Sequence, residues 1–461
     1  MKINNLISIA ALAFMAGCTT PSKEWQNPVL NIAGGQVQGV VLDSTDVLVY
    51  RGIPYAAAPV GELRWKRPQP IQAWDTIMIA DHFGNAAMQR KHNPNDGNYG
   101  TEFFAQDAPF SEDCLYLNVW TPKDAAGDTT KNLPVAMWVH GGGYSGGWGF
   151  EPEMDGQAWA EHGVILVTIN YRLGVMGFFN HPELSAENEE HISGNYGFYD
   201  QAYALQWVHD NIAQFGGNPD DITLLGQSAG ATSVKTLCVS PLTKNLVKKA
   251  IIQSAGGMRP GQIDYSQEEL DAQGKRVMDE AGLTTLEQLR NASWEELEKV
   301  IAAQRGPGHE PFSMGVHCDG VGLVEMFEPG SKNGTIADIP YLVGQMENDI
   351  HDVDTFSDFI QIREPISKQP VYKYYFKRAL PSDGRPSIEG AFHSGELWYE
   401  FHTLSRSWRP FTEADYELSD RMVDYWTNFA KYGNPNGENV DGEWKVSTSA
   451  NPYVQILDVK Q

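Results

Sequence analysis

The sequence has little positive charge. It contains 34 lysines and arginines against 59 aspartates and glutamates, which gives a net charge of −25, and no run of lysine or arginine is longer than two residues. Binding to nucleic acids or to anionic membranes needs clustered basic side chains. We therefore expect no nucleic-acid partner, and the acidic balance slightly disfavours anionic substrates.

Cysteine is scarce, with four residues in 461. Cys18 lies near the start of the chain, and the other three are Cys114, Cys238 and Cys318. No CxxC pair and no cysteine–histidine spacing typical of a metal site occurs. We expect no metal and no cofactor, and we interpret the three later cysteines as buried free thiols.

No apolar run is long enough to cross a bilayer. The longest near the N-terminus, Leu6–Met15, follows the positive Lys2 and is the length of a signal-peptide core. Small residues then precede Cys18, as in a bacterial lipobox. The sequence predicts a lipoprotein signal peptide at 1–17, lipidation of Cys18 and a polar tether at 18–30. We therefore expect an exported protein of the cell envelope, either periplasmic or anchored to the outer membrane. Its membrane contact would be only through the lipidated N-terminus. The alternative is an ordinary cleaved signal with an incidental cysteine.

Short apolar runs of strand length alternate with helical patterns through the rest of the chain. This alternation is typical of a mostly parallel sheet that is covered by helices on both faces. Residues 31–461 show no internal repeat and no linker, so we predict one domain. A charged, amphipathic stretch at 266–304 predicts short helices that form a cap. The predicted strands are Val37–Val41, Val47–Tyr50, Leu115–Trp120, Val135–Val139, Val164–Ile169, Ala250–Gln253, Tyr341–Val343 and Val371–Phe376.

Ser228 is the strongest candidate for a reactive residue. It lies in GQSAG, where a short apolar strand stops at Gly226 and a helix begins near Ala229. Glycines at 226 and 230 allow the sharp turn that exposes a serine hydroxyl, which is the nucleophile elbow of α/β-hydrolases. The sequence therefore predicts a nucleophilic serine.

A glycine loop supplies a second signal. His140 and the glycines at 141–143 directly follow an apolar strand. Consecutive glycines let backbone N–H groups converge on the oxyanion of a tetrahedral intermediate. The amides of Gly142, Gly143 and Ala229 are the predicted oxyanion hole.

A nucleophilic serine needs a histidine base and an orienting acid, in the chain order serine, acid, histidine. His393 lies in a loop-like stretch after the Val371–Phe376 strand, where this fold places its base. The remaining downstream histidines, which we interpret as ordinary solvated residues, are His309, His317, His351 and His402.

Taken together, these motifs resemble the type-B carboxylesterase family, which includes cholinesterases and bacterial p-nitrobenzyl-type esterases. FGGNPDDITLLGQSAG is similar to the family's serine signature, and EDCLYLN at 112–118 is similar to its second signature. The blocks YRGIPYAAAPVGELRW, NYRLGVMGFF, GNYGFYDQ and WTNFAKYGNPN follow the family's order. The resemblance implies an α/β-hydrolase fold with a mostly parallel central sheet, helices on both faces and a reduced helical cap.

The resemblance also assigns the acid and its surroundings. It places the acid five residues after Gly344, at Asp349, with Glu347 and Asp352 as rivals. Gln227 stands where many relatives have glutamate, and Ser254 resembles the family's serine near the triad. The family's internal ion pairs correspond to Arg64 with Glu112 and Arg172 with Asp200. The usual cysteine partner of Cys114 is absent, so no disulfide is expected there.

The function implied is hydrolysis of small-molecule carboxylic esters through an acyl-enzyme intermediate. Two further functions stay open: an amidase or peptidase that uses the same triad, and a non-catalytic binding protein on the same fold. Tyr144, Trp148 and residues 266–330 are expected to shape the pocket. No pattern in the sequence indicates the physiological ester or the oligomeric state.

Overall fold

The computed structural model describes residues 26–103, 108–258, 264–304, 312–350, 356–437, 439–440 and 442–460. The predicted signal peptide at 1–17 and the lipidation site Cys18 lie outside the described residues. The end of the predicted tether belongs to the folded body: Asn27 donates to Gly39 O at 2.7 Å, and Leu30 is buried at the start of a strand. The folded unit therefore begins a few residues before position 31.

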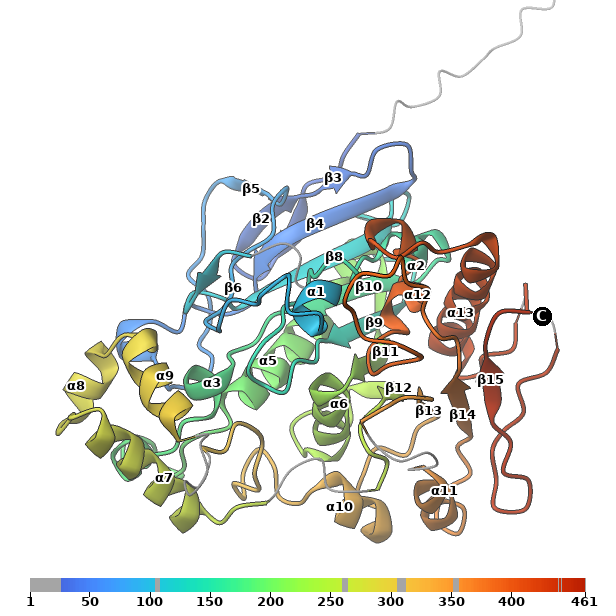
Figure 1. Cartoon of the computed structure of the whole chain (residues 1–461). Coiled ribbons are helices and arrows are strands. Elements are labelled where there is room, and N and C mark those ends of the chain that lie inside the picture. Colours follow the sequence, from blue (N-terminus) through green and yellow to red (C-terminus); the bar gives the residue numbers. More distant parts are fainter. Residues whose placement is uncertain are drawn as a thin grey trace, which may run out of the picture.

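A ten-stranded sheet forms the centre of the molecule, in the order β15-β14-β13-β12-β11-β9-β10-β8-β4-β3 (Figure 1). From β10 to β15 every neighbouring pair is parallel, whereas β8, β4 and β3 run antiparallel at one edge. The predicted mostly parallel sheet is confirmed. Its strands are Val40–Val41 (β3), Val47–Pro54 (β4), Tyr116–Pro122 (β8), Leu133–Val139 (β9), Ile165–Ile169 (β10), Gly217–Gln227 (β11), Val247–Gln253 (β12), Tyr341–Met346 (β13), Val371–Phe376 (β14) and Gln455–Leu457 (β15).

Two smaller sheets lie beside the antiparallel edge. One has the order β1-β2-β5 and the other pairs β6 with β7. Their strands are Leu30–Ile32 (β1), Gly35–Gln38 (β2), Ile77–Ile79 (β5), Ala86–Ala87 (β6) and Phe110–Ser111 (β7). The segment predicted as one strand at 37–41 is thus divided between β2 and β3, which belong to different sheets.

The main sheet is covered on both faces because its strands are apolar on both sides. In β9, Val135, Met137 and Val139 enter one core, and Ala136 and Trp138 enter the other, as the alternation of side chains along a strand requires. The first core includes side chains of α5 and α6, and the second includes side chains of α2, α12 and α13.

The helices are mostly short. The long C-terminal helix begins at Glu413, where Thr412 and Asp415 form a capping box. The helices are Tyr99–Glu102 (α1), Gln157–Glu161 (α2), Gly174–Phe178 (α3), Pro182–Ser185 (α4), Tyr196–Asn211 (α5), Ala229–Val239 (α6), Gln267–Glu280 (α7), Leu286–Asn291 (α8), Trp294–Ala303 (α9), Phe327–Asn333 (α10), Ser357–Arg363 (α11), Leu397–Glu400 (α12) and Glu413–Tyr432 (α13), with 3-10 turns at Gly61–Leu63 (η1), Ile212–Phe215 (η2) and Leu404–Arg406 (η3).

The predicted cap is present as α7, α8 and α9, which project to one side of the sheet (Figure 1). Ser266 and Ser293 each form a capping box with the glutamate three residues later, which fixes where α7 and α9 begin. Their apolar faces form a separate small core with Trp65, Val175 and Phe179. The cap is therefore attached to the body near α3, beside the site described below.

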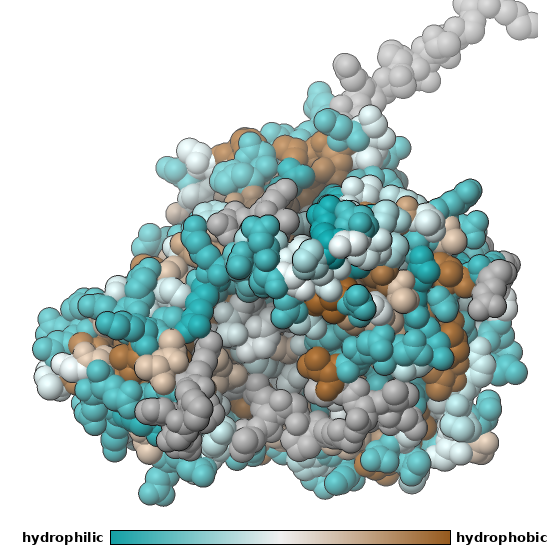
Figure 2. Space-filling model, viewed as in Figure 1, coloured by the Kyte–Doolittle hydropathy of each residue, from teal (hydrophilic) through white to brown (hydrophobic). Residues whose placement is uncertain are grey.

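The visible surface of the molecule is largely polar (Figure 2). The face in Figure 2 is mostly hydrophilic, with hydrophobic residues in scattered patches. Within the described ranges, no helix is both long enough and apolar enough to cross a membrane.

Candidate active site

Ser228 lies at the sharp turn between β11 and α6. Its backbone is in an unfavourable conformation, with φ 59° and ψ −126°, and its N–H donates to Gln253 O at 2.9 Å. A Cβ atom at Gly230 would lie 2.0 Å from Val139 O, so only glycine allows α6 to pack this close to the end of β9. Strained turns of this kind are concentrated at functional sites. The predicted elbow geometry is confirmed.

His393 and Asp349 form a hydrogen-bonded pair. Asp349 follows β13, and His393 lies in the loop between β14 and α12. His393 Nδ1 lies 2.7 Å from Asp349 Oδ1, and the side chains are 8% and 0% exposed. Backbone N–H groups of Met346 and Ile350 also donate to this carboxylate, at 3.2 and 2.7 Å. The pair is therefore buried and fixed in orientation.

Asp349 is held in its charged form. Burial alone raises the pKa of this carboxyl. The hydrogen bond and charge of His393 lower the pKa, and so do the nearby Ser254 hydroxyl and the Met346 N–H. Together they hold the pKa of Asp349 below its usual range. A carboxylate in this state orients the imidazole and stabilises its protonated form.

The rival residues that the structure describes lie elsewhere. Glu347 is half exposed and pairs with Lys377 at 3.4 Å. His317 is buried, and His402 pairs with Asp420 at 2.9 Å; neither lines the cavity that contains Ser228. Asp352, His309 and His351 lie outside the described residues.

Gln227 connects the turn to the histidine. Its Nε2 lies 3.3 Å from His393 Nε2, and its Oε1 accepts a hydrogen bond from Ser394 at 2.9 Å. When Nδ1 of the imidazole is protonated and donates a hydrogen bond to Asp349, Nε2 has a free lone pair that can accept a hydrogen bond from this amide. The base nitrogen of His393 is thus in contact with the Gln227 amide. Such contacts rearrange when substrate enters.

The glycine loop follows β9 and lies against Ser228. Gly142 and Gly143 have φ of 96° and 62°, and a Cβ atom at Gly142 would lie 2.1 Å from Gly146 O. The amide of Ala229 belongs to the first residue of α6. Helix N-termini and glycine turns both present N–H groups to anions. The loop geometry therefore suits an oxyanion hole.

His140 supports this loop. It is buried, its ring stacks on Tyr171 at 4.4 Å between centroids, and Tyr171 donates a hydrogen bond to His140 O at 2.9 Å. Burial lowers the pKa of His140 to about 4. The ring is therefore neutral at physiological pH and holds the loop without taking up a proton.

A cavity of about 570 Å³ brings these residues together. Ser228, His393, Gln227 and the glycines at 141–143 all line it. Of the helices of the cap, α9 alone contributes to the cavity wall, through Trp294 and Glu298, and Met314 also lines the cavity. Tyr144 and Trp148 do not line it, in contrast to expectation. Tyr144 is instead buried against Phe178, and Trp148 contacts Phe110 and Phe150. Wall residues that no pattern in the sequence indicated include Gln89, Arg90, Lys91, His92, Tyr99, Glu151, Glu153 and Met154.

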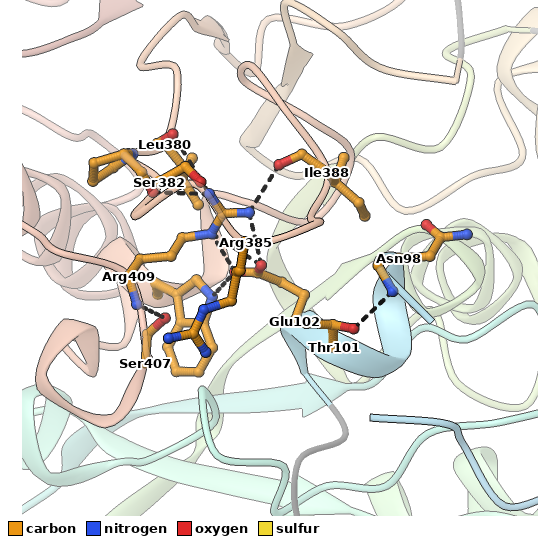
Figure 3. Close-up of polar contacts among 12 residues, drawn as sticks. Asn98, Thr101, Glu102, Leu380, Ser382, Arg385, Ile388, Ser407 and Arg409 are labelled. Atoms are coloured by element: carbon orange, nitrogen blue, oxygen red, sulfur yellow. Dashed lines mark hydrogen bonds and ion pairs between the residues drawn. The ribbon is translucent and has the colours of Figure 1, made fainter. Parts of the chain in front are cut away.

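One wall of the cavity is α1, which carries Tyr99 and leads to Phe103. Tyr99 lies edge-on to His393, with 6.5 Å between ring centroids. A fully buried ion pair fixes α1: Arg409 binds Glu102 at 2.8 Å and also donates to Ile388 O at 2.9 Å (Figure 3). Breaking a buried pair of this kind typically costs about 3–5 kcal/mol. The aromatic wall is therefore rigidly connected to the chain segment around His393.

Ser254 and Glu396 surround the acid. Ser254 directly follows β12 and has φ 55°, and its N–H donates to Gly344 O at 2.8 Å. Glu396 is completely buried; burial and the charge of Asp349 raise its pKa to about 8. Glu396 is therefore neutral at pH 7, which leaves Asp349 as the charged acid beside His393.

The ion pairs follow the expectations, and so do two of the three thiols. Arg64 binds Glu112, and Arg172 binds Asp200 at 2.7 Å in the core. Cys114 and Cys238 are buried free thiols, and Cys318 is a partly buried one. Among the described residues, no group of three or more cysteine, histidine or acidic side chains is arranged to hold a metal ion.

Comparison with known proteins gives consistent matches. The carboxylesterase family matches residues 26–358 and 353–461. The fumonisin B1 esterase of Sphingopyxis macrogoltabida is 39% identical over 352 residues, which cover 75% of this chain and 61% of that protein, so this chain spans less than two thirds of that relative. The pyrethroid hydrolase Ces2e of Rattus norvegicus is 30% identical and is matched over 95% of this chain and 88% of its own length.

Solved structures match over nearly the whole chain. A PNB esterase superposes with a TM-score of 0.80 at 28% identity, covering 94% of this chain and 96% of that one. The carboxylesterase EST55 of Geobacillus stearothermophilus superposes with a TM-score of 0.75 at 30% identity, covering 93% and 96%.

Proposed function

This chain belongs to the carboxylesterase family and is a carboxylic ester hydrolase, and from that premise we propose that Ser228, His393 and Asp349 carry out the hydrolysis through an acyl-enzyme intermediate. The observation that supports this assignment best is the 2.7 Å hydrogen bond between His393 and Asp349, because His393 lines the same cavity as Ser228. A serine hydroxyl becomes a nucleophile when such an oriented base takes its proton.

The reaction proceeds in two halves. When substrate enters, His393 Nε2 leaves the Gln227 amide and contacts the Ser228 hydroxyl instead. It takes the proton of that hydroxyl while Ser228 Oγ attacks the ester carbonyl. His393 then protonates the departing alcohol, and the acyl group stays on Ser228. Water, deprotonated by His393, releases the acid and restores the serine.

The oxyanion of each tetrahedral intermediate is held by the amides of Gly142, Gly143 and Ala229. A donor of this kind is typically worth about 2.7–4 kcal/mol to the transition state. Asp349 stays ionised and stabilises the imidazolium that forms. The substrate is a small-molecule ester, and a cavity of about 570 Å³ is within the range of small-molecule sites.

Trapping the intermediate tests this mechanism. After a short reaction with p-nitrophenyl acetate and quenching in acid, we expect one acetyl group per chain, on the peptide that contains Ser228, by mass spectrometry. An acetyl group on another residue, or none during turnover, would contradict the assignment of the nucleophile.

We further propose that the protein is an exported bacterial lipoprotein anchored through Cys18. Support comes from the sequence at 1–18 and from the packing of Asn27 and Leu30, which attaches the start of the folded body just after the tether. The Cys18→Ala variant is expected to move from the membrane fraction to the soluble fraction and to lose incorporation of labelled palmitate. An unchanged distribution would refute lipidation.

A further inference from the structure

The small sheet β1-β2-β5 has an outer face that carries no charged side chain. Residues that pair in register lie on the same side of a sheet, and two registers link these three strands. The side chains that share the outer face are Asn31, Gln36, Gln38, Ile77 and Ile79. The outer face is therefore neutral, although the chain as a whole has a net charge of −25.

The isoleucines of the outer face are left in solvent. The opposite side of the sheet supplies the core, where Leu30 and Val37 are buried, whereas Ile77 and Ile79 are 46% and 47% exposed. Val41, on the edge strand β3, is also exposed at this end of the molecule. Figure 2 shows hydrophobic residues gathered there, close to the point where the chain enters the folded body. Neighbouring apolar side chains on edge strands favour a partner.

The polar groups of the outer face already have hydrogen-bond partners. Gln36 Nε2 donates to Asn31 Oδ1 at 3.1 Å, and Gln38 Nε2 donates to Asn27 O at 2.9 Å. Beside them, the indole N–H of Trp74 donates to Gln36 O at 2.9 Å. Removing water from a polar group costs less when the group keeps a hydrogen bond. Tryptophan is also enriched at membrane–water boundaries. The outer face is thus suited to a lipid surface.

The start of the folded body lies at this same face. Asn27 accepts the hydrogen bond of Gln38 and donates to Gly39 O at 2.7 Å. Cys18 precedes Asn27 by nine positions, and a segment of that length spans at most about 30 Å when fully extended. A lipid on Cys18 would therefore keep the outer face close to the bilayer.

We propose that the outer face of β1-β2-β5 docks on the lipid surface in which the lipidated Cys18 is anchored. Ile77 and Ile79 enter the headgroup region, and the amides beside them meet the headgroups. Because the face is uncharged, it can approach anionic lipids that would repel an acidic surface. The inference rests on the proposed lipidation of Cys18, and it adds a second membrane contact to the one expected from the N-terminus alone.

A fluorescent probe at position 79 tests this contact in the full, lipidated chain. The Ile79→Cys protein is labelled with an environment-sensitive dye and mixed with phosphatidylethanolamine–phosphatidylglycerol vesicles. The emission of the dye is expected to shift to the blue and to lose its quenching by iodide. Labelling of the chain without an introduced cysteine measures the contribution of the native thiols.

The matched control places the same dye at Ile456→Cys. Ile456 is 47% exposed, like Ile79, and lies on β15, at the other edge of the main sheet. Its dye should show no shift when vesicles are added. Equal shifts at the two positions, or no shift at position 79 in a chain that sediments with the vesicles, would overturn the docking proposal.

A charge on the outer face should abolish the contact. Ile77→Asp in the Ile79→Cys chain, or Gln36→Glu if the first fails to fold, is expected to remove the blue shift. Hydrolysis of p-nitrophenyl acetate should be unchanged, because neither residue lines the cavity of Ser228. A blue shift retained in both variants would refute the assignment of the face.

Sedimentation with vesicles separates this proposal from the lipidation of Cys18. A chain that sediments but shows no shift at position 79 refutes the docking alone, whereas a chain that does not sediment refutes the lipidation and the docking with it. A shift at position 79 that needs no vesicles and grows with protein concentration would assign the face to a second copy of the chain and overturn the lipid contact.

Discussion

Replacing Ser228 by alanine is expected to lower kcat for p-nitrophenyl acetate by about 10⁴- to 10⁶-fold, the range found when a serine hydrolase loses its nucleophile. The hydroxyl is the group that forms the covalent intermediate, so nothing in the cavity can replace it. Steady-state kinetics with purified protein measure the loss. Thermal unfolding should remain near that of the wild type, because alanine at φ 59° differs from serine only by the hydroxyl.

Ser233 provides the control for this substitution. It lies on α6, close behind Ser228, and its hydroxyl donates to Ala229 O at 3.1 Å. It is buried and does not line the cavity. Ser233→Ala is therefore expected to change kcat by only a few-fold. Substantial activity in the Ser228→Ala protein would refute the assignment of the nucleophile.

Asp349→Asn is expected to reduce kcat by about 10⁴-fold, as the corresponding change does in serine proteases. An amide at this position can hold His393 in the wrong tautomer, with its proton on Nε2, and it removes the charge that stabilises the imidazolium. The predicted result is a loss in kcat with a small change in KM, measured with p-nitrophenyl acetate.

Glu347→Gln is the matched control, because Glu347 is the rival acid two residues earlier in the same loop. It is half exposed and pairs with Lys377. A surface pair of this kind contributes little, so we expect nearly full activity. The reverse ranking, with the Glu347 variant inactive and the Asp349 variant active, would reassign the acid.

Local patterns in the sequence were sufficient to place much of the site. The strand–glycine–serine–glycine–helix order predicts the position of Ser228, and the glycines after the Val135–Val139 strand predict a loop beside it. His393 follows from its place after a late strand. In each case the functional residue lies at the end of one element of secondary structure. Parallel strands bring these ends to one edge of the sheet.

Other parts of the site depend on packing between distant segments. Nothing near Tyr99 or Glu153 in the sequence indicates that they share a cavity with Ser228. The amide of Gln227 reaches His393 across 166 positions, and Tyr144, which was expected in the pocket, turns into the core against Phe178. Contacts of this kind are set by how helices and loops fit together, which composition and periodicity do not encode.

The ion pair between Glu102 and Arg409 has a consequence for how the chain folds. It joins positions 307 residues apart, so most of the chain must be in place before it can form. Closing such a long loop costs conformational entropy, so contacts of this kind tend to form late. Strands β3 to β13 and the turn at Ser228 all precede Arg409 in the chain, and they can therefore assemble before the aromatic wall docks. A substitution that removes the Arg409 guanidinium would keep the nucleophile and the base, yet it would leave Glu102 as an unpaired acid in that wall.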